Sequence, residues 1–462
     1  MEQSAAAFFG EKMKLFVRDK EFYKKALTIA VPISLQSMIT IGVNLADTVM
    51  VGTLGESSLS ATALAGQFVN IFAICCMGLG MGASVLTARF WGMKDIPSLK
   101  KAVTIMLRLV SILAIFVFTI PSILFPEGIM KLYTEDPAVI AEGIRYIKWM
   151  VPCYLLQGLS TTCTIVLRSV GQVKIPLFSS IGAFFVNIFF NYIFIFGKLG
   201  VPKLEIEGAG IGTFIARAFE FVFICGYLFV MDQKIRYRFK DIFTKCSDLL
   251  RTYISISIPV FISDTLLALG NSAVAMVMGR IGTNFVSANS ITTVTQQLST
   301  VLIQGICHAS CIMTGHTLGE GKRQKAKDEA WTFLGLAAAV GIVGAGIILI
   351  LKWPIINFYN ITDETKLIAN ELMNSIAVIV VFQSMNSILT KGVLRAGGDT
   401  KFLMAADILF LWILSIPLGA LAGLVWHWNA FWIYFALKAD QVVKAVWCLF
   451  RLRGEKWIKV IK

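Results

Sequence analysis

Long runs of apolar residues separated by short polar breaks dominate the pattern along the chain. A hydrocarbon layer about 30 Å thick requires about 20 apolar residues in each helix that crosses it. Runs of that length predict an all-α integral membrane protein with twelve transmembrane helices. The runs cover residues 26–50, 58–88, 102–125, 138–166, 176–197, 209–231, 252–279, 285–315, 330–351, 366–390, 402–424 and 429–450.

The second and eighth runs are longer and less apolar than the others. The second contains Gln67 and Asn70, and the eighth contains Gln297 with further amides on either side. Because an amide side chain that faces lipid is costly, we expect these faces to look into the bundle or a wet cavity. Gln67, Asn70 and Gln297 are therefore candidate residues of a substrate cavity.

The charge pattern supports membrane insertion and an even number of crossings. Only 15% of the residues are charged, whereas soluble domains carry roughly 25%, and 42 basic residues outnumber 28 acidic ones. Most of the basic residues fall in the two termini and in alternate loops, which predicts that both termini are cytoplasmic in a bacterial cell membrane. This topology explains the basic excess without a nucleic-acid partner. The opposite loops hold only Lys131, Lys198, Lys203, Arg280, Lys352 and Lys366.

The two halves of the chain match each other at a fixed offset. Pro32 and Pro259 lie 227 positions apart, and the loops LRSVGQVK and LRAGGDTK, at 167–174 and 394–401, match at the same offset. The matched positions fall at the same place in each set of six predicted helices, which indicates an internal repeat. Because six crossings return the chain to the same side, we expect two parallel six-helix lobes around a central cleft.

The predicted organisation follows from this repeat. We expect a cytoplasmic and amphipathic N-terminal segment, two lobes, a basic cytoplasmic linker between them and a basic tail. The five parts are 1–24, 25–231, 232–251, 252–450 and 451–462.

Several stretches resemble the multidrug and toxic compound extrusion (MATE) transporters. They are ADTVMVGTLG, GLGMGASVLTARFWGMKD, the two LRxxG loops, NIFFNYIFIFG, EGAGIGTFIARAFE and IPLG, and they cover both halves of the chain. The resemblance implies an exporter of organic, often cationic, compounds that is driven by inward flow of sodium ions or protons.

The resemblance also implies a cation-coupling site. Asp47 matches the family's coupling carboxylate in the first helix, with Asn187 and Asn191 in the fifth helix and Thr213 in the sixth as its neighbours. Some members carry Asp at the position of Asn191. The Asn here leaves one carboxylate, and the identity of the ion stays open.

The residues themselves leave two interpretations of Asp47. It lies 22 residues after Lys25, about 33 Å along a helix, so it could be a solvated carboxylate near the outer membrane surface. Alternatively, Asn187 and Asn191 share one helix face by their i, i+4 spacing, and their oxygens could join Asp47 around a cation or a shared proton.

Further charged residues lie inside predicted helices. Asp264 is near the middle of the seventh helix and is a candidate for binding substrate or a proton, with a structural ion pair as the alternative. Arg217 and Glu220 are three residues apart and predict a structural ion pair on the sixth helix. We assign no function to Asp407, which lies toward the cytoplasmic end of its helix and can reach the membrane interface, or to Asp440, which has Lys444 one turn later.

Known catalytic and metal motifs do not appear. The sequence has no nucleotide-binding GxxxxGK[ST], no HExxH and no GxSxG that follows a strand, so we expect no enzyme activity. Cys307, His308 and Cys311 have helical spacing but no fourth ligand nearby, so we expect packing rather than a metal site.

We therefore expect a monomeric transporter that contacts small-molecule substrates and membrane lipid and needs no cofactor besides its coupling ion. Two alternatives stay open. One is a flippase for lipid-linked saccharides with the same fold, and the other is a membrane scaffold or enzyme.

Overall fold

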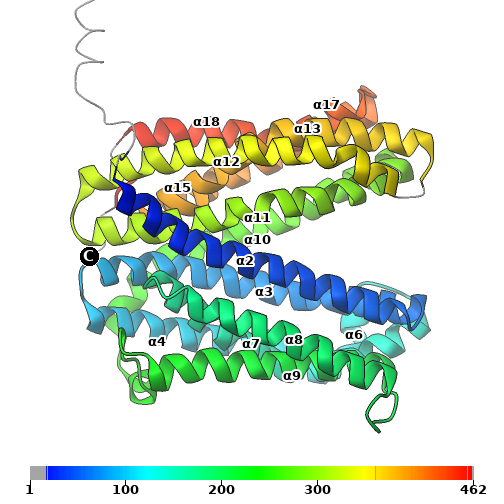
Figure 1. Cartoon of the computed structure of the whole chain (residues 1–462), viewed down its shortest axis with the longest axis horizontal. Helices are drawn as coiled ribbons and strands as arrows, with labels where there is room; N and C mark the ends of the chain where they lie inside the picture. The colour runs from blue at the N-terminus through cyan, green and yellow to red at the C-terminus, as the bar shows by residue number, and fades with distance from the viewer. Residues whose placement is uncertain (1–16, 18, 359–360, 455, 460–462) are drawn as a thin grey trace, which may run out of the picture. The chain divides into compact units, whose positions relative to one another are not determined.

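Figure 1 shows the computed structural model of the chain, which describes residues 17, 19–358, 361–454 and 456–459. Most of the predicted amphipathic segment 1–24 lies outside these residues. Regular structure in the described part is entirely helical. Eleven of the helical segments are long and apolar enough to cross a membrane.

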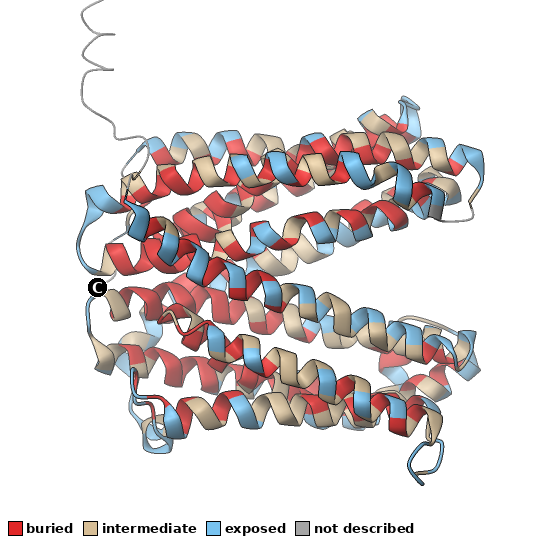
Figure 2. Ribbon diagram, in the orientation of Figure 1, coloured by how far each residue is buried: buried red, intermediate tan, exposed pale blue. Residues whose placement is uncertain are grey.

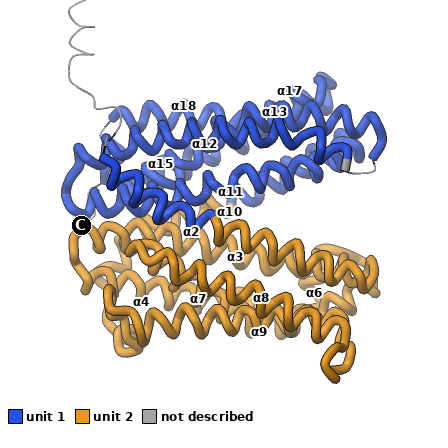
Figure 3. The backbone as a smooth tube through the Cα atoms, viewed as in Figure 1, with its two compact units in different colours: residues 1–34, 266–462 blue, residues 35–265 orange. Residues whose placement is uncertain are grey.

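The chain divides into two compact units, which Figure 3 distinguishes by colour. Unit 2 comprises residues 35–265, and unit 1 comprises 1–34 together with 266–462. Both dividing points fall inside a helix, because α2 (Lys20–Gly52) and α10 (Ser247–Ile281) each belong partly to both units. The predicted lobe boundaries would place each of these helices in a single lobe.

Unit 2 is built mainly from four long helices. Helix α8 packs against α9, and α7 packs against both α3 and α9 (Figure 1). Its elements are the second part of α2, α3 (Glu56–Gly92), α4 (Ile96–Ile112), η1 (Leu113–Thr119), α5 (Ile120–Leu124), α6 (Pro126–Lys131), α7 (Pro137–Ser169), α8 (Lys174–Phe196), α9 (Glu205–Gly226), η2 (Tyr227–Met231), η3 (Phe239–Phe243) and the first part of α10.

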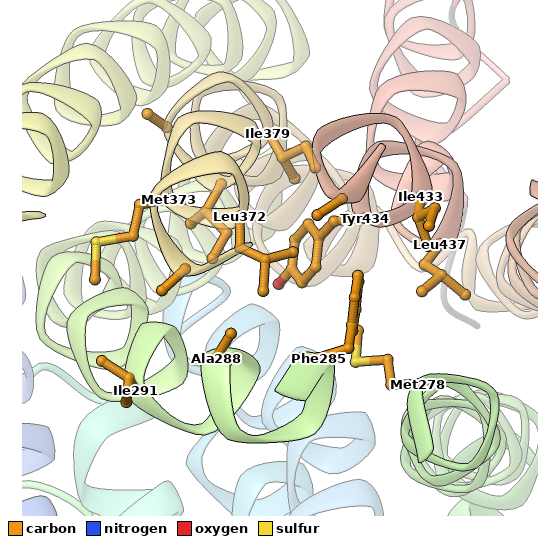
Figure 4. Close-up of a cluster of buried hydrophobic side chains, with 14 of the residues drawn as sticks. Met278, Phe285, Ala288, Ile291, Leu372, Met373, Ile379, Ile433, Tyr434 and Leu437 are labelled. Atoms are coloured by element: carbon orange, nitrogen blue, oxygen red, sulfur yellow. The ribbon is translucent and has the colours of Figure 1, made fainter. Parts of the chain in front are cut away.

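Unit 1 repeats this plan, with α11, α12 and α13 packed against one another. Its elements after the second part of α10 are α11 (Thr283–Gly319), α12 (Arg323–Phe358), α13 (Asp363–Ser387), η4 (Ile388–Val393), α14 (Leu394–Ala396), α15 (Thr400–Asp407), η5 (Ile408–Ser415), α16 (Ile416–Ala420), η6 (Leu421–Val425), α17 (Ala430–Leu437) and α18 (Ala439–Arg453). Figure 4 shows part of its core, where Tyr434 and Leu437 of α17 meet Leu372 of α13 and Phe285 of α11.

Close helix contacts recur at the offset of the sequence repeat. In unit 2, α10 crosses α3 so closely that a Cβ atom at Gly78 would lie 3.0 Å from the Cα atom of Phe261. In unit 1, α2 crosses α11 in the same way, and a Cβ atom at Gly305 would collide with Ser34. Gly305 lies 227 positions after Gly78, and Phe261 lies 227 positions after Ser34, so the two contacts are equivalent in the repeat. The first helix of each repeat therefore packs on the second helix of the other repeat.

A polar contact after the fourth helix of each repeat also recurs at the offset of 227 residues. Gln172 donates from Nε2 to Oδ1 of Asp232 at 2.6 Å, and the equivalent positions are Asp399 and Lys459, whose side chains lie 3.5 Å apart. The linker after η2 is thereby fixed to unit 2, because the carboxylate of Asp232 also accepts the backbone N–H of Ile235 at 2.8 Å.

The twelfth predicted helix, 429–450, differs from the prediction of one continuous span. Helix α17 ends at Leu437, Lys438 leaves the helical conformation with φ −118° and ψ 14°, and α18 begins at Ala439. The expectation that Asp407 reaches the membrane interface was wrong, because its side chain is buried and its Oδ1 lies 3.0 Å from Nζ of Lys444. A broken helix with buried charge is tolerated in a membrane where it lines a cavity.

The packing of α10 on α3 gives a test of this arrangement. Figure 2 shows the buried second half of α3, where a Cβ atom at Gly82 would lie 2.5 Å from the Cα atom of Ser257. Because backbone must move to admit a side chain, we expect Gly82→Val to destabilise the fold by roughly 3 kcal/mol. Gly66→Ala on the same helix meets nothing within 4 Å and should leave stability unchanged or slightly raised. Thermal unfolding of the two purified variants in detergent measures their stabilities. Equal unfolding midpoints for Gly82→Val and Gly66→Ala would contradict the close contact of α10 with α3.

Candidate functional site

A cavity of about 280 Å³ lies inside unit 2 and is bounded by the second part of α2 and by α3, α7, α8 and α9. The polar side chains that line it are Gln36, Thr40, Asn44, Asp47, Gln157, Thr161, Thr164, Arg168, Ser180, Asn187, Thr213, Arg217 and Glu220. Such a concentration of polar groups inside an apolar bundle is typical of a functional site.

Three of the four predicted cation-coupling residues are joined by hydrogen bonds at this cavity. Nδ2 of Asn191 donates to Oδ1 of Asp47 at 2.6 Å and lies 3.3 Å from Oδ1 of Asn187. The helical spacing of Asn187 and Asn191 on α8 therefore presents both amides toward α2. The fourth residue, Thr213 on α9, lines the same cavity.

Asn191 carries the clearest unmet polar group. Its amide is almost fully buried, and its Oδ1 atom has no hydrogen-bond partner among the described residues. The site thus offers an acceptor oxygen beside a carboxylate, and oxygen ligands of this kind suit a hard cation.

Gly212 on α9 makes room for this amide, because a Cβ atom there would collide with Oδ1 of Asn191. Sequence reasoning missed this residue. It gave no role to a glycine within EGAGIGTF, because only the packing of α9 on α8 reveals the contact.

Arg217 and Glu220 lie at the same cavity and form an ion pair, with Nη1 and Oε2 2.9 Å apart. The basic charge of α9 is therefore engaged by its own helix. Among the described residues, no salt bridge engages Asp47. The carboxylate of Asp47 is half-buried and is held by an amide rather than by a cation.

A second polar group at the cavity was not predicted. Arg168 donates from Nη2 to Oε1 of Gln36, and Gln36 donates from Nε2 to Oγ of Ser180 at 2.8 Å. The identity of Arg168 and Arg395 across the repeat was the sequence signal that could have drawn attention to it.

The predicted substrate-cavity residues lie elsewhere. Gln67, Asn70 and Gln297 are exposed on the surface of the described chain, and Asp264 is half-buried on α10. None of the four lines the cavity of unit 2. In α11 it is Gln296, not Gln297, whose amide points inward, because its Nε2 lies 3.1 Å from Oε1 of Gln383. Their part in substrate binding stays a prediction.

Comparison with known families decides what kind of protein this is. The MatE family model matches residues 32–193 and again residues 259–421. The chain belongs to the MatE family. The two matched segments begin 227 positions apart and correspond to the two repeats.

Named MatE relatives cover nearly the whole chain. The probable multidrug resistance protein NorM of Agrobacterium fabrum is 24% identical over 417 residues, which is 86% of each chain. The multidrug resistance protein MdtK of Edwardsiella ictaluri is 25% identical and covers 93% of this chain and 95% of its own. This MatE protein is therefore a multi-pass membrane transporter and not an enzyme.

Solved structures of MATE transporters share the fold. The Vibrio cholerae MATE transporter VcmN in its bent form matches with a TM-score of 0.85 at 16% identity, over 95% of this chain and 97% of its own. An outward-facing multidrug resistance MATE transporter matches with a TM-score of 0.84 at 18% identity, over 95% and 98% of the two chains. These matches support twelve helices in two six-helix lobes.

The contact of Gly212 with Asn191 provides a test that removes no polar group. Because a methyl group at position 212 must displace the amide, we expect Gly212→Ala to raise the ion concentration needed for half-maximal transport roughly tenfold, or about 1.4 kcal/mol. Gly226→Ala on the same helix meets nothing within 4 Å and serves as the matched control. Dye efflux from vesicles at graded ion concentrations measures the effect. Identical ion dependence in the two variants would rule out a role for the geometry of Asn191.

Proposed function

We propose that this transporter exports organic, often cationic and amphipathic, compounds by antiport with sodium ions or protons that bind at Asp47. The observation that carries the proposal is a carboxylate at an intramembrane cavity that receives an amide hydrogen bond and has no ion-pair partner among the described residues.

Electrostatics favours an incoming positive charge at this position. Burying a carboxylate without a partner costs several kcal/mol, and a proton or a bound metal cation removes that cost. The charge of Arg217 also acts on Asp47, but its guanidinium group contacts Glu220, so a solute ion is the partner that can contact the carboxylate of Asp47 directly. Asn187, which lines the cavity together with Asp47, offers a further amide oxygen to a metal cation.

Binding at Asp47 supplies a driving force for export. Moving one positive charge inward down a potential of about 100 mV releases about 2.3 kcal/mol, to which the concentration gradient of the ion adds. Release of the ion leaves Asp47 negative again. We infer that this change of charge biases the lobe between two arrangements, in which the cavity opens to opposite sides of the membrane.

The names of two relatives support organic compounds as the substrate class, since NorM is described as a probable multidrug resistance protein and MdtK as a multidrug resistance protein. The flippase alternative requires unpaired cations that hold a pyrophosphate. Arg217 and Lys444 are engaged by carboxylates. Arg168, which contacts the amide of Gln36, is then the one cation of the unit 2 cavity with no carboxylate in ion-pair contact among the described residues. A single such cation favours organic cations over lipid pyrophosphates.

Replacement of Asp47 tests the coupling role. In proteoliposomes that contain a cationic dye, we expect Asp47→Asn to lower gradient-driven efflux by roughly tenfold or more, because the amide cannot take up charge. Sodium and proton gradients are imposed separately to identify the ion. Asp248→Asn, at an exposed carboxylate that pairs with Lys101, is the control and should transport normally. Full efflux by Asp47→Asn at equal protein content would contradict the assignment.

Asp264 can be tested in the same vesicles. If it contacts a cationic substrate, Asp264→Asn should raise the dye concentration for half-maximal efflux several-fold and leave the ion dependence unchanged. A change in ion dependence alone would instead place Asp264 with the coupling ion.

A further inference from the structure

Unit 1 contains a second polar cavity, of about 170 Å³, between α10, α11, α13, α15 and α18. At its centre, Nζ of Lys444 lies 3.0 Å from Oδ1 of Asp407 and 2.9 Å from Oδ2 of Asp440. The three side chains are 2%, 8% and 1% exposed. A buried lysine thus lies between two buried carboxylates.

The two cavities occupy corresponding places in the repeat. Adding 227 to lining residues of the first cavity gives lining residues of the second at seven positions: Thr40 and Leu267, Asn44 and Asn271, Met77 and Gln304, Thr164 and Lys391, Ser180 and Asp407, Thr213 and Asp440, and Arg217 and Lys444. The paired cation, half-buried Arg217 or buried Lys444, is therefore at the same position in each lobe.

The carboxylates around that cation differ between the lobes. The counterparts of Asp47 and Glu220 are Val274 and Trp447, so unit 1 lacks both acidic groups of the first cavity. Its own carboxylates, Asp407 and Asp440, both bind the lysine. Unit 2 holds a carboxylate without an ion-pair partner in the described part of the chain, whereas both carboxylates of unit 1 contact one ammonium group.

The second cavity contains more acceptor oxygens than Lys444 uses. Oδ2 of Asp440 also accepts from Nε2 of Gln441 at 2.6 Å, and Gln441 accepts from Nδ2 of Asn386 at 2.8 Å. Oδ1 of Asp440 and Oδ1 of Asn386 are buried and have no hydrogen-bond partner among the described residues. Carboxylate and amide oxygens gathered in a buried cavity are the ligands that hard monovalent cations and ammonium groups prefer.

The other charged groups at the cavity oppose entry of a further cation. Lys438, at the break between α17 and α18, donates to Oδ1 of Asn271 at 3.1 Å, and Lys391 of η4 also lines the space. Counted with Lys444, three lysines face two aspartates. Other titratable side chains nearby are Tyr434, whose hydroxyl donates to Oε1 of Gln296 at 3.4 Å, and Cys448, one turn beyond Lys444. An added sodium ion would increase the positive excess, which is unfavourable in a low-dielectric site.

We propose that the ammonium group of Lys444 permanently occupies a monovalent-cation site in unit 1. The lobe carries this cation covalently, and the site accepts sodium or a small primary ammonium ion only when the lysine side chain is removed. One consequence concerns the coupling ion and rests on the proposed role of Asp47. Because Lys444 fills the site of unit 1, the external ion enters only the cavity of unit 2.

Sodium binding to the purified full-length protein tests the proposal. Equilibrium binding of radioactive sodium is measured for Lys444→Met and for the same protein with Lys444 intact. The buffer contains N-methylglucamine chloride, whose cation is too large for the cavity. We expect Lys444→Met to bind one additional sodium ion per chain, in the wild-type background and in Asp47→Asn alike. Lys444→Arg keeps the site filled and should add none. Methylammonium should compete for the new site.

The decisive quantity is the increment caused by Lys444→Met. A folded variant that binds no additional sodium would overturn the proposal. Failure of the Asp47 assignment is recognised separately in the efflux assay, because Asp47→Asn would then keep full gradient-driven efflux whatever the Lys444 variants bind. If Lys444→Met folds only in sodium or methylammonium, that dependence is the expected result. The triple variant Asp407→Asn, Lys444→Met, Asp440→Asn carries no unpaired carboxylate at this site and should fold without either cation. The proposal would be contradicted if the triple variant folds but Lys444→Met does not fold in sodium or in methylammonium.

Discussion

Charge inside a low-dielectric bundle must be balanced locally, and this constraint explains the polar interior of the transporter. The two equivalent basic groups on the last helix of each repeat have a carboxylate within ion-pair distance: Glu220 for half-buried Arg217, and Asp407 with Asp440 for buried Lys444. Asp47 differs, because amides rather than a cation contact it. The incomplete balance at Asp47 is the physical basis of the proposed coupling.

The fold supplies the positions at which this balance is set. Each repeat begins with a helix that packs on the second helix of the other repeat, and glycines at these crossings allow backbones to approach closely. The arrangement ties α2, which carries Asp47, into unit 2 over the part of its length that lines the cavity. Gly212 then sets the depth at which the amide of Asn191 meets the carboxylate.

Much of this could be predicted from the sequence, because hydrophobic runs and a repeat of 227 residues depend only on local pattern. The proximity of Asn187 and Asn191 followed from helical spacing, and the resemblance to MATE transporters pointed to Asp47. The pairing of Asp407 with Lys444 could not be predicted, since the two residues are 37 positions apart on different helices and their contact depends on how those helices are rotated. The break at Lys438 also escaped prediction, because lysine has a good helix propensity and only the surrounding cavity explains it.

Exchange of substrate for ion in the reverse direction tests the central claim most directly. A gradient of cationic dye, imposed across proteoliposomes with no initial ion gradient, should drive sodium ions or protons uphill in the opposite direction in the wild type. The account predicts that Asp47→Asn abolishes this ion movement. Equal dye-driven ion movement in the wild type and in Asp47→Asn, or none in the wild type while the dye itself is transported, would contradict it.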